Sequence, residues 1–231
     1  MSESAETPSS EVLAIDGPAG AGKSTIARRV ADRLGWAYLD TGAMYRAVTR
    51  EALDRGLEPG DAAAVAALAS DLDLVLAPDG RVTVGGADVT ARLRSPEVTE
   101  AVSTVAAIPA VRDVMVRHQR RFARENGRIV AEGRDIGTVV FPDARVKVWL
   151  DADPEERARR RLAETARAPG SDPADLQAMK ARLERRDRLD STRAVAPLKP
   201  ADDARRINTT AMTPDEVVEA VLTTVQSALS T

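Results

Sequence analysis

The chain has 231 residues, of which 43% are hydrophobic and 30% are charged, and its net charge is −3. This composition predicts a packed core, excludes an overall positive field for nucleic acid or membrane surfaces, and includes no apolar run near the ~20 residues that span a bilayer. There is no cysteine and one histidine, His118, which excludes disulfides and thiolate metal sites and fits a reducing cytoplasm.

The first half of the chain alternates predicted strands and helices. Residues 1–10 are polar and acidic, lack the basic-then-apolar order of a signal peptide, and are expected to be a disordered tail. An apolar strand over 12–16 is followed by a glycine-rich turn and a helix over 23–34. A strand over 36–39 then leads into a helix over 42–55. This alternation predicts a parallel sheet covered on both faces, in one α/β domain over residues 11–231.

The character changes near Gly60, and residues 61–126 are interpreted as an insertion into a core of 11–60 and 127–231. The turn Pro78-Asp79-Gly80 predicts a hairpin within it. Its expected elements are a helix over 62–70, strands over 73–76 and 81–84, and helices over 97–107 and 110–125.

The strand and helix pattern resumes after the insertion. Thr213 and Glu216 form a predicted capping box, with Pro214 at the first position of the last helix. The other expected elements are strands over 128–131, 145–150 and 205–208, and Arg-rich helices over 154–167 and 172–188.

Residues 17–24, GPAGAGKS, match the phosphate-loop pattern G-x-x-x-x-G-K-[ST]. Such a loop points several backbone N–H groups at one anion, and the helix that follows adds its positive end. Lys23 would reach the β- and γ-phosphates, and the Ser24 hydroxyl could ligate Mg²⁺. Only four of the 33 basic residues are lysines, so a lysine here is notable. The stretch predicts a nucleoside triphosphate site rather than a glycine-rich turn without a ligand.

A phosphate loop alone does not separate switch GTPases, motor ATPases and small-molecule kinases. No Asn-Lys pair occurs in the chain, so the N-K-x-D motif of guanine recognition is missing. A motor ATPase usually has a longer chain and an apolar strand ending in paired acids, for which Ala131-Glu132 is a weak match. A kinase remains the favoured class, and it requires a second anion site facing the first.

The stretch LDTGAMYR, residues 39–46, is a candidate for that second site. Thr41 is placed as the N-cap of the following helix, and Arg46 lies within about its first turn. The alternative, an ordinary capped helix with a solvated arginine, is about equally compatible with this stretch.

The Arg-rich helices offer further cations. Arg157 and Arg161 lie four residues apart on one helix, as do Arg182 and Arg186 on the next, and the spacing suggests like charges without local partners. Residues 168–171, APGS, would suit a hinge, so the segment over about 155–172 is interpreted as a short lid over ATP. A solvated helical arm remains the alternative.

Four motifs together resemble the cytidylate kinase family: DGPAGAGKST, LDTGAMYR, EGRDIGTVVFPDA and RDRLDSTRAVAPL. The resemblance runs in order from about residue 12 to 225. It implies a nucleoside monophosphate kinase fold with a five-stranded parallel sheet, an acceptor-binding insertion and a short lid. It also implies transfer of the ATP γ-phosphoryl group to CMP or dCMP with Mg²⁺, and, with no nucleic acid or membrane partner indicated, a monomer is expected.

The resemblance implies a role for each matching residue. The ATP site would comprise Gly17, Pro18, Ala19, Gly20, Ala21, Gly22, Lys23, Ser24 and Thr25. The CMP site would comprise Thr41, Tyr45, Arg46, Ser103, Arg112, Arg134, Asp135, Arg186, Asp190 and Arg193. The catalytic cations would be Lys23, Arg134, Arg157, Arg161, Arg186 and Arg193, with Ser24 as the Mg²⁺ ligand.

The Arg134-Asp135 pair also has a chemical interpretation of its own. A carboxylate can accept from the exocyclic amine that distinguishes cytosine from uracil, and an arginine can donate to the ring acceptors. Within the resemblance, Arg134 is expected to bind the acceptor phosphate and Asp135 to check the amine. The motif near Asn208 departs from the family pattern, which usually has aspartate there, and Thr41 stands where serine is common. A kinase for UMP, AMP or a small hydroxyl compound, and a regulatory nucleotide-binding module, remain alternatives.

Overall fold

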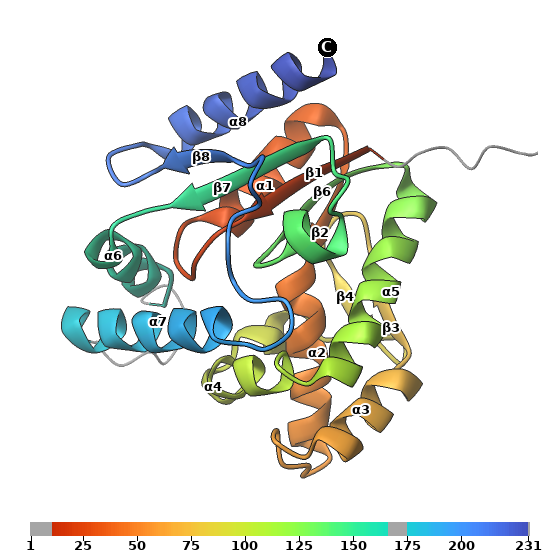
Figure 1. The fold of residues 1–231 in the computed structure, drawn as a ribbon. Helices are drawn as coiled ribbons and strands as arrows, with labels where there is room; N and C mark the ends of the chain where they lie inside the picture. Colours follow the sequence, from red (N-terminus) through yellow and green to blue (C-terminus); the bar gives the residue numbers. More distant parts are fainter. Residues whose placement is uncertain (1–10, 166–174, 231) are drawn as a thin grey trace, which may run out of the picture.

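The computed structural model describes residues 11–165 and 175–230, so the expected tail and the expected lid from residue 166 onward lie outside the described residues. Five parallel strands form the main sheet, in the spatial order β2-β6-β1-β7-β8 (Figure 1). The strands are β1 (Glu11–Asp16), β2 (Ala37–Asp40), β6 (Arg128–Gly133), β7 (Val146–Asp151) and β8 (Arg205–Asn208). The predicted five-stranded parallel sheet is confirmed.

Helices cover both faces of this sheet. The helices that the structure describes are α1 (Lys23–Leu34), α2 (Thr41–Asp54), α3 (Ala62–Asp71), α4 (Pro96–Val105), α5 (Pro109–Asn126), α6 (Pro154–Thr165), α7 (Leu176–Ser191) and α8 (Pro214–Leu229). Of these, α1 and α8 contribute to the apolar core on one face and α2 and α5 to the core on the other, whereas α6 and α7 form a separate apolar cluster with the phosphate loop. Alternate residues of β1 enter two different apolar cores, as the period of two in a strand requires. Leu13 and Ile15 pack in the core that includes α1 and α8, whereas Val12 and Ala14 pack in the core that includes α2. None of the described helices has the length and apolar character needed to cross a bilayer.

Residues 61–126, interpreted above as an insertion, share the core that includes α2 with the sheet. The small antiparallel sheet of this segment consists of β3 (Leu74–Leu76), β4 (Val82–Val84) and β5 (Ala87–Asp88). Leu74 and Val82 belong to the same buried cluster as Val12 of β1. This segment is therefore packed against the main sheet through a shared apolar core.

Three elements were not predicted from the sequence, and the first is a short 3-10 helix over Thr90–Arg94. β5 follows Gly85-Gly86, a pair that suggested the end of the hairpin rather than a third strand. Residues Ile136–Val140 form a short π-helical turn, where the apolar and β-branched run gave no helical signal. The turn is held by tertiary contacts, because the Asp16 carboxylate accepts hydrogen bonds from the N–H groups of Ile136 (2.9 Å) and Gly137 (2.8 Å).

The register of the central strands sets the position of the site. Asp16, the last residue of β1, is paired with Gly133, the last residue of β6, and Asp40 at the end of β2 is paired with Glu132. The phosphate loop follows β1, and Arg134 follows β6. Both therefore emerge at the same carboxyl edge, where open α/β sheets bind ligands.

The turn between β3 and β4 docks on the core through Gly80. Its φ is +86°, and a Cβ there would lie 2.7 Å from Arg28 Nη2 and 2.9 Å from the Tyr38 ring. The neighbouring Pro78 carbonyl accepts a hydrogen bond from the Tyr38 N–H at 3.0 Å. This turn thus contacts β2 and α1, the helix that follows the phosphate loop.

We expect Gly80→Ala to destabilise the protein more than the matched control Gly86→Ala. Both positions have positive φ, +86° and +79°, so both variants carry a backbone cost of roughly 1–2 kcal/mol. Gly86 has no atom within 4 Å of an added Cβ, whereas Gly80 would also be overpacked against Tyr38, at a further cost of roughly 1–3 kcal/mol. Urea unfolding measures the difference. Equal destabilisation by the two variants would contradict the docked turn.

Candidate active site

A cavity of about 620 Å³ opens at the carboxyl edge of the sheet, between the phosphate loop and the insertion. The predicted site residues that line it are Ala19, Gly20, Gly22, Lys23, Ser24, Thr25, Thr41, Tyr45, Arg46, Ser103, Arg112, Arg134, Asp135, Arg161, Arg186, Asp190 and Arg193. The predicted residues outside this lining are Gly17, Pro18, Ala21 and Arg157. Residues from six separate parts of the sequence therefore meet in one place.

The phosphate loop has the backbone that its glycines permit. A Cβ at Gly17, where φ is +152°, would lie 2.0 Å from the Leu150 carbonyl oxygen of β7, so only glycine fits this close approach. Gly22 caps α1 in a left-handed conformation, and no side chain caps the helix. The first-turn N–H groups of α1 are therefore not satisfied by a side-chain cap, which suits an anion.

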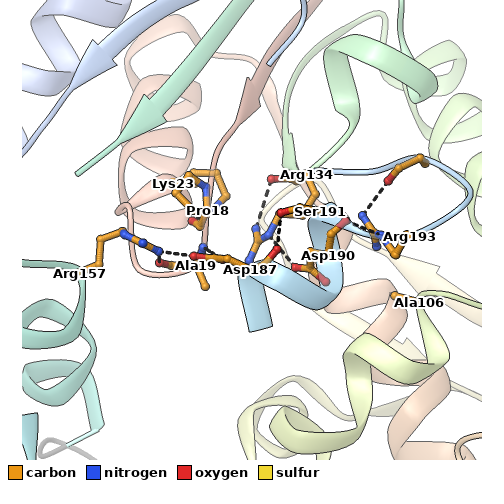
Figure 2. Close-up of polar contacts among 12 residues, drawn as sticks. Pro18, Ala19, Lys23, Ala106, Arg134, Arg157, Asp187, Asp190, Ser191 and Arg193 are labelled. Carbon is orange, nitrogen blue, oxygen red and sulfur yellow. Dashed lines mark hydrogen bonds and ion pairs between the residues drawn. The ribbon is translucent and has the colours of Figure 1, made fainter. Parts of the chain in front are cut away.

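Lys23 is buried and turned back onto its own loop. Its Nζ donates to the Pro18 carbonyl at 2.7 Å (Figure 2). Burial, and then the positive charge of Arg134, lower the pKa of Lys23, while the Glu132 carboxylate opposes that change. A phosphate would give this ammonium group a stronger partner than a carbonyl.

Glu132 is a buried residue of this site that the sequence analysis did not select. It lies at the end of β6, and its carboxylate accepts a hydrogen bond from the Tyr38 hydroxyl at 3.1 Å. Burial and then Asp40 raise the pKa of Glu132, whereas Lys23 and the Ser24 hydroxyl lower it. The feature of the sequence that could have identified Glu132 is its place as a carboxylate at the end of an apolar strand. From the sequence it is interpreted only as a weak match to the acid of a motor ATPase.

The start of α2 corrects one prediction. The N-cap is Asp40, whose carboxylate accepts the Ala43 N–H at 2.9 Å, and not Thr41. The Thr41 hydroxyl instead donates to the Glu132 carbonyl at 2.7 Å, which joins α2 to β6. Asp40 is the N-cap because strand β2 extends to this residue and Thr41 is already the first residue of the helix.

Arg46 is buried, so the interpretation of a solvated arginine on a capped helix is wrong. Its Nη1 donates to the Thr99 hydroxyl at 2.9 Å and to the Leu93 carbonyl at 3.2 Å. Burial, followed by the nearby guanidinium of Arg186, lowers the pKa of Arg46 to about 9. These contacts join α2 to the segment over 93–99, and both acceptors are neutral.

A second group of cations comes from β6 and α7. The Arg134 Nε donates to the Asp190 carboxylate at 3.2 Å (Figure 2). Arg186 is partly buried, and its buried Nε has no hydrogen-bond partner among the described residues. Desolvation, followed by the charge of Arg134, lowers its pKa to about 10. Arg94, which the sequence analysis missed, also lines the cavity. Closely grouped cations of this kind favour an anionic ligand.

The pair expected to recognise a base is assembled in the same cavity. The Arg112 guanidinium bonds to the Asp135 carboxylate, and its Nη1 also donates to the Ala106 carbonyl at 3.2 Å. Both side chains are buried, with exposures of 3% and 7%. The Tyr45 ring lies 5.5 Å from the Arg112 guanidinium carbon. Burial raises the pKa of Asp135, while Arg112 and then Arg193 oppose the change.

Arg157 and Arg161 of α6 both have partners, contrary to the expectation of like charges without local partners. Arg161 pairs with Glu164 at 2.8 Å and still lines the cavity. Arg157 is buried against Asp187 of α7 and lies outside the cavity lining (Figure 2). The partner of Arg157 is 30 residues away, so no local spacing pattern predicts it.

Asn208, the departure from the family pattern, has a local structural contact. Its Oδ1 accepts the Thr210 N–H at 2.9 Å, and the adjacent Thr209 accepts from Arg160. Aspartate could make the same contact to the Thr210 N–H, since the bond uses an oxygen acceptor.

The fold and this cavity define a P-loop kinase. A model of the family described as "Cytidylate kinase" matches residues 13–227. The chain is 48% identical over 223 residues to a cytidylate kinase of Nocardia farcinica, with 95% of each chain covered. It is 50% identical over 210 residues to one of Corynebacterium efficiens, with 90% of each covered. The chain belongs to the cytidylate kinase family.

Other relatives are longer. A bifunctional pantoate ligase/cytidylate kinase of a Synechococcus species is 54% identical over 216 residues, which cover 92% of this chain and 44% of that protein. The chain therefore spans less than half the length of this relative. Among solved structures, an uncharacterized protein from Eubacterium ventriosum has a TM-score of 0.53 at 12% identity, covering 94% of this chain and 99% of that one. That likeness concerns the fold alone.

We expect ATP binding to take up protons at about pH 7.5, because the phosphates counter the effects of burial and Arg134 and raise the pKa of Lys23 in the complex. Calorimetric titration in two buffers with different ionisation enthalpies measures this uptake. In the control Lys23→Arg, the charge remains but does not titrate in this range, so the uptake should fall. Equal uptake by the wild-type protein and the variant would contradict a lowered pKa for Lys23.

Proposed function

We propose that the chain phosphorylates CMP and dCMP with ATP, giving CDP and dCDP. The observation that carries this proposal is the buried Arg112–Asp135 pair, which lies in one cavity with a cluster of arginines and the phosphate loop. Membership of the cytidylate kinase family supports the same substrates. The rest of this section assigns the steps of that reaction to residues.

The donor half is the phosphate loop, Gly17 to Thr25. Its backbone N–H groups and the start of α1 would hold the β- and γ-phosphates of ATP, with Lys23 leaving the Pro18 carbonyl to reach them. Ser24 would ligate Mg²⁺, and its place beside the Glu132 carboxylate supplies the hard oxygen surroundings that this ion prefers. No group of three or more metal-ligating side chains occurs in the described part of the chain, which fits an ion held mainly by phosphates and one or two protein oxygens. Bound Mg²⁺ would neutralise charge on the triphosphate.

The acceptor half is assigned to the residues around α2, β6 and α7. We assign the acceptor phosphate to Arg46 and Arg134, with Thr41 and Tyr45 at the same end of α2. The base would meet Arg112 and Asp135, where Asp135 Oδ2 is bonded to Arg112 and Oδ1 is assigned to the cytosine amine. Ser103 is assigned to the base. Arg186, Asp190 and Arg193 are assigned to the sugar and the transferring phosphates.

Catalysis then requires position and charge rather than a general base. An oxygen of the CMP phosphate is already a nucleophile, so it attacks the γ-phosphorus in line as the bond to the bridging β–γ oxygen breaks and ADP leaves. Lys23, Arg134, Arg161, Arg186 and Arg193 surround the path of the transferring group. Arg157 would contribute through the loop that it contacts.

The proposed working form is a monomer, which leaves a small kinase free to open and close around its substrates. The proposed setting is the cytoplasm, where ATP and CMP are available, and the proposed partners are these small substrates rather than nucleic acid or membrane. A coupled assay of ADP release with CMP, dCMP, UMP and AMP tests the reaction. Release of ADP with CMP and dCMP above the other acceptors is expected. Another preferred acceptor, or ATP binding without ADP release, would contradict the proposal.

Asp135→Asn should reduce kcat/KM for CMP by roughly a hundredfold or more, because the amide presents a donor where the cytosine amine needs an acceptor. The KM for ATP should change little, since the phosphate loop is intact. Steady-state kinetics with CMP and UMP measure both effects. The CMP-to-UMP preference should fall, and an unchanged preference would show that Asp135 does not recognise the base.

A further inference from the structure

Asp187 and Arg157, which lie outside the cavity lining, bind the backbone N–H and the backbone carbonyl of Ala19 in the phosphate loop. The Asp187 Oδ1 accepts the Ala19 N–H at 2.9 Å, and Arg157 Nη1 donates to the Ala19 carbonyl at 2.9 Å. Arg157 Nη1 also bonds to Asp187 Oδ2, which closes the group (Figure 2). One side chain of α6 and one of α7 thus bind the same short piece of the loop.

Close packing also holds Ala19 and Gly20 of the loop between α6 and α7. A Cβ at Gly20 would lie 2.9 Å from the Arg157 carbonyl oxygen and 3.3 Å from Leu183 Cδ1. Ala19 itself is buried in a small cluster with Ala158, Met179 and Leu183. The loop therefore has little room to move unless the Asp187–Arg157 pair is broken.

The pair also resolves an electrostatic difficulty. A lone carboxylate bonded to a phosphate loop would repel the phosphates, but Arg157 neutralises it. The Asp187 side chain is 15% exposed and the Arg157 side chain is 8% exposed, so solvent screens the pair only weakly. The Arg157 Nε is used as well, since it donates to the Ala152 carbonyl at 3.1 Å. The pair thus holds the loop in place and adds almost no net charge to the donor site.

Helix α7 connects this pair to the acceptor half. Arg186 precedes Asp187 and lines the cavity, and Asp190, one turn further on, binds Arg134. We propose that Asp187 is a positioning residue that, with Arg157, fixes the phosphate loop to the helix that carries acceptor-site residues. It would thereby set the separation of the two reacting phosphates. This inference rests on the proposed function and deepens it.

The test compares Asp187→Ala and Asp187→Asn with the control Glu184→Gln, a carboxylate of α7 outside the cavity lining. For Asp187→Ala we expect kcat to fall roughly ten- to a hundredfold and the Kd for ATP to rise severalfold, with KM for CMP within about twofold of wild type. Asp187→Asn should lie between, because its amide oxygen still accepts the Ala19 N–H but does not ion-pair with Arg157. Glu184→Gln should match the wild type.

Displacement of a fluorescent ATP analogue gives the ATP affinity without any acceptor, and thermal unfolding checks that each variant is folded. An unchanged kcat in folded Asp187→Asn and Asp187→Ala would overturn the inference, as would a KM for CMP that rises as much as the Kd for ATP. Tighter ATP binding would also overturn it, because the carboxylate would then be competing with phosphate. If the wild type does not phosphorylate CMP but Asp187→Ala still weakens ATP binding, the loop contact holds and the proposed function fails.

Discussion

The parallel pairing of β1 with β6 determines where the chemistry of this protein can take place. The hydrogen-bonded register places Asp16 beside Gly133, so the phosphate loop and Arg134 leave the sheet as neighbours. The Asp16 carboxylate strengthens this arrangement by accepting the N–H groups of Ile136 and Gly137, although burial raises its pKa to about 6. A carboxylate is thus buried at a cost in order to hold the acceptor-side backbone against the donor-side strand.

A second constraint follows from the charges that this edge brings together. Lys23, Arg46 and Arg186 are all largely buried, and for each of them burial is the main cause of a lowered pKa. Such a site stores unfavourable desolvation that anionic ligands can relieve. In the proposed reaction, the phosphates of ATP and CMP supply the missing negative charge. Their binding should therefore couple the two halves of the cavity and stabilise the folded protein.

The parts of the fold that depend on local signals could be predicted from the sequence. Helix α1 has the predicted bounds and α8 has the predicted capping box of Thr213 with Glu216, because glycine, proline and capping residues mark these helix ends directly. Strand β8 also has the predicted bounds. The cap of α2 was assigned one residue late, since both Asp40 and Thr41 can cap a helix and only the extent of β2 decides between them.

Features that depend on distant partners could not be predicted in this way. The turn at Ile136–Val140 needs the Asp16 carboxylate 120 residues earlier, and Arg157 needs Asp187 on another helix. The recognised motifs placed most candidate residues in the cavity because each motif sits at the end of a strand or the start of a helix. Tyr38 and Arg94 belong to no such motif, and only the packed structure brings them to the same edge as Glu132, the first residue of EGRDIGTVVFPDA.

In the proposed reaction, one cavity would hold an adenosine triphosphate and a cytidine monophosphate end to end. Calorimetric titration with an adenosine and a cytidine joined through five phosphates tests this claim most directly. The account predicts one molecule bound per chain, displaced by ATP and by CMP alike, with higher affinity than either substrate and higher affinity than the uridine counterpart. Displacement by only one of the two substrates, or equal affinity for the cytidine and uridine compounds, would contradict it.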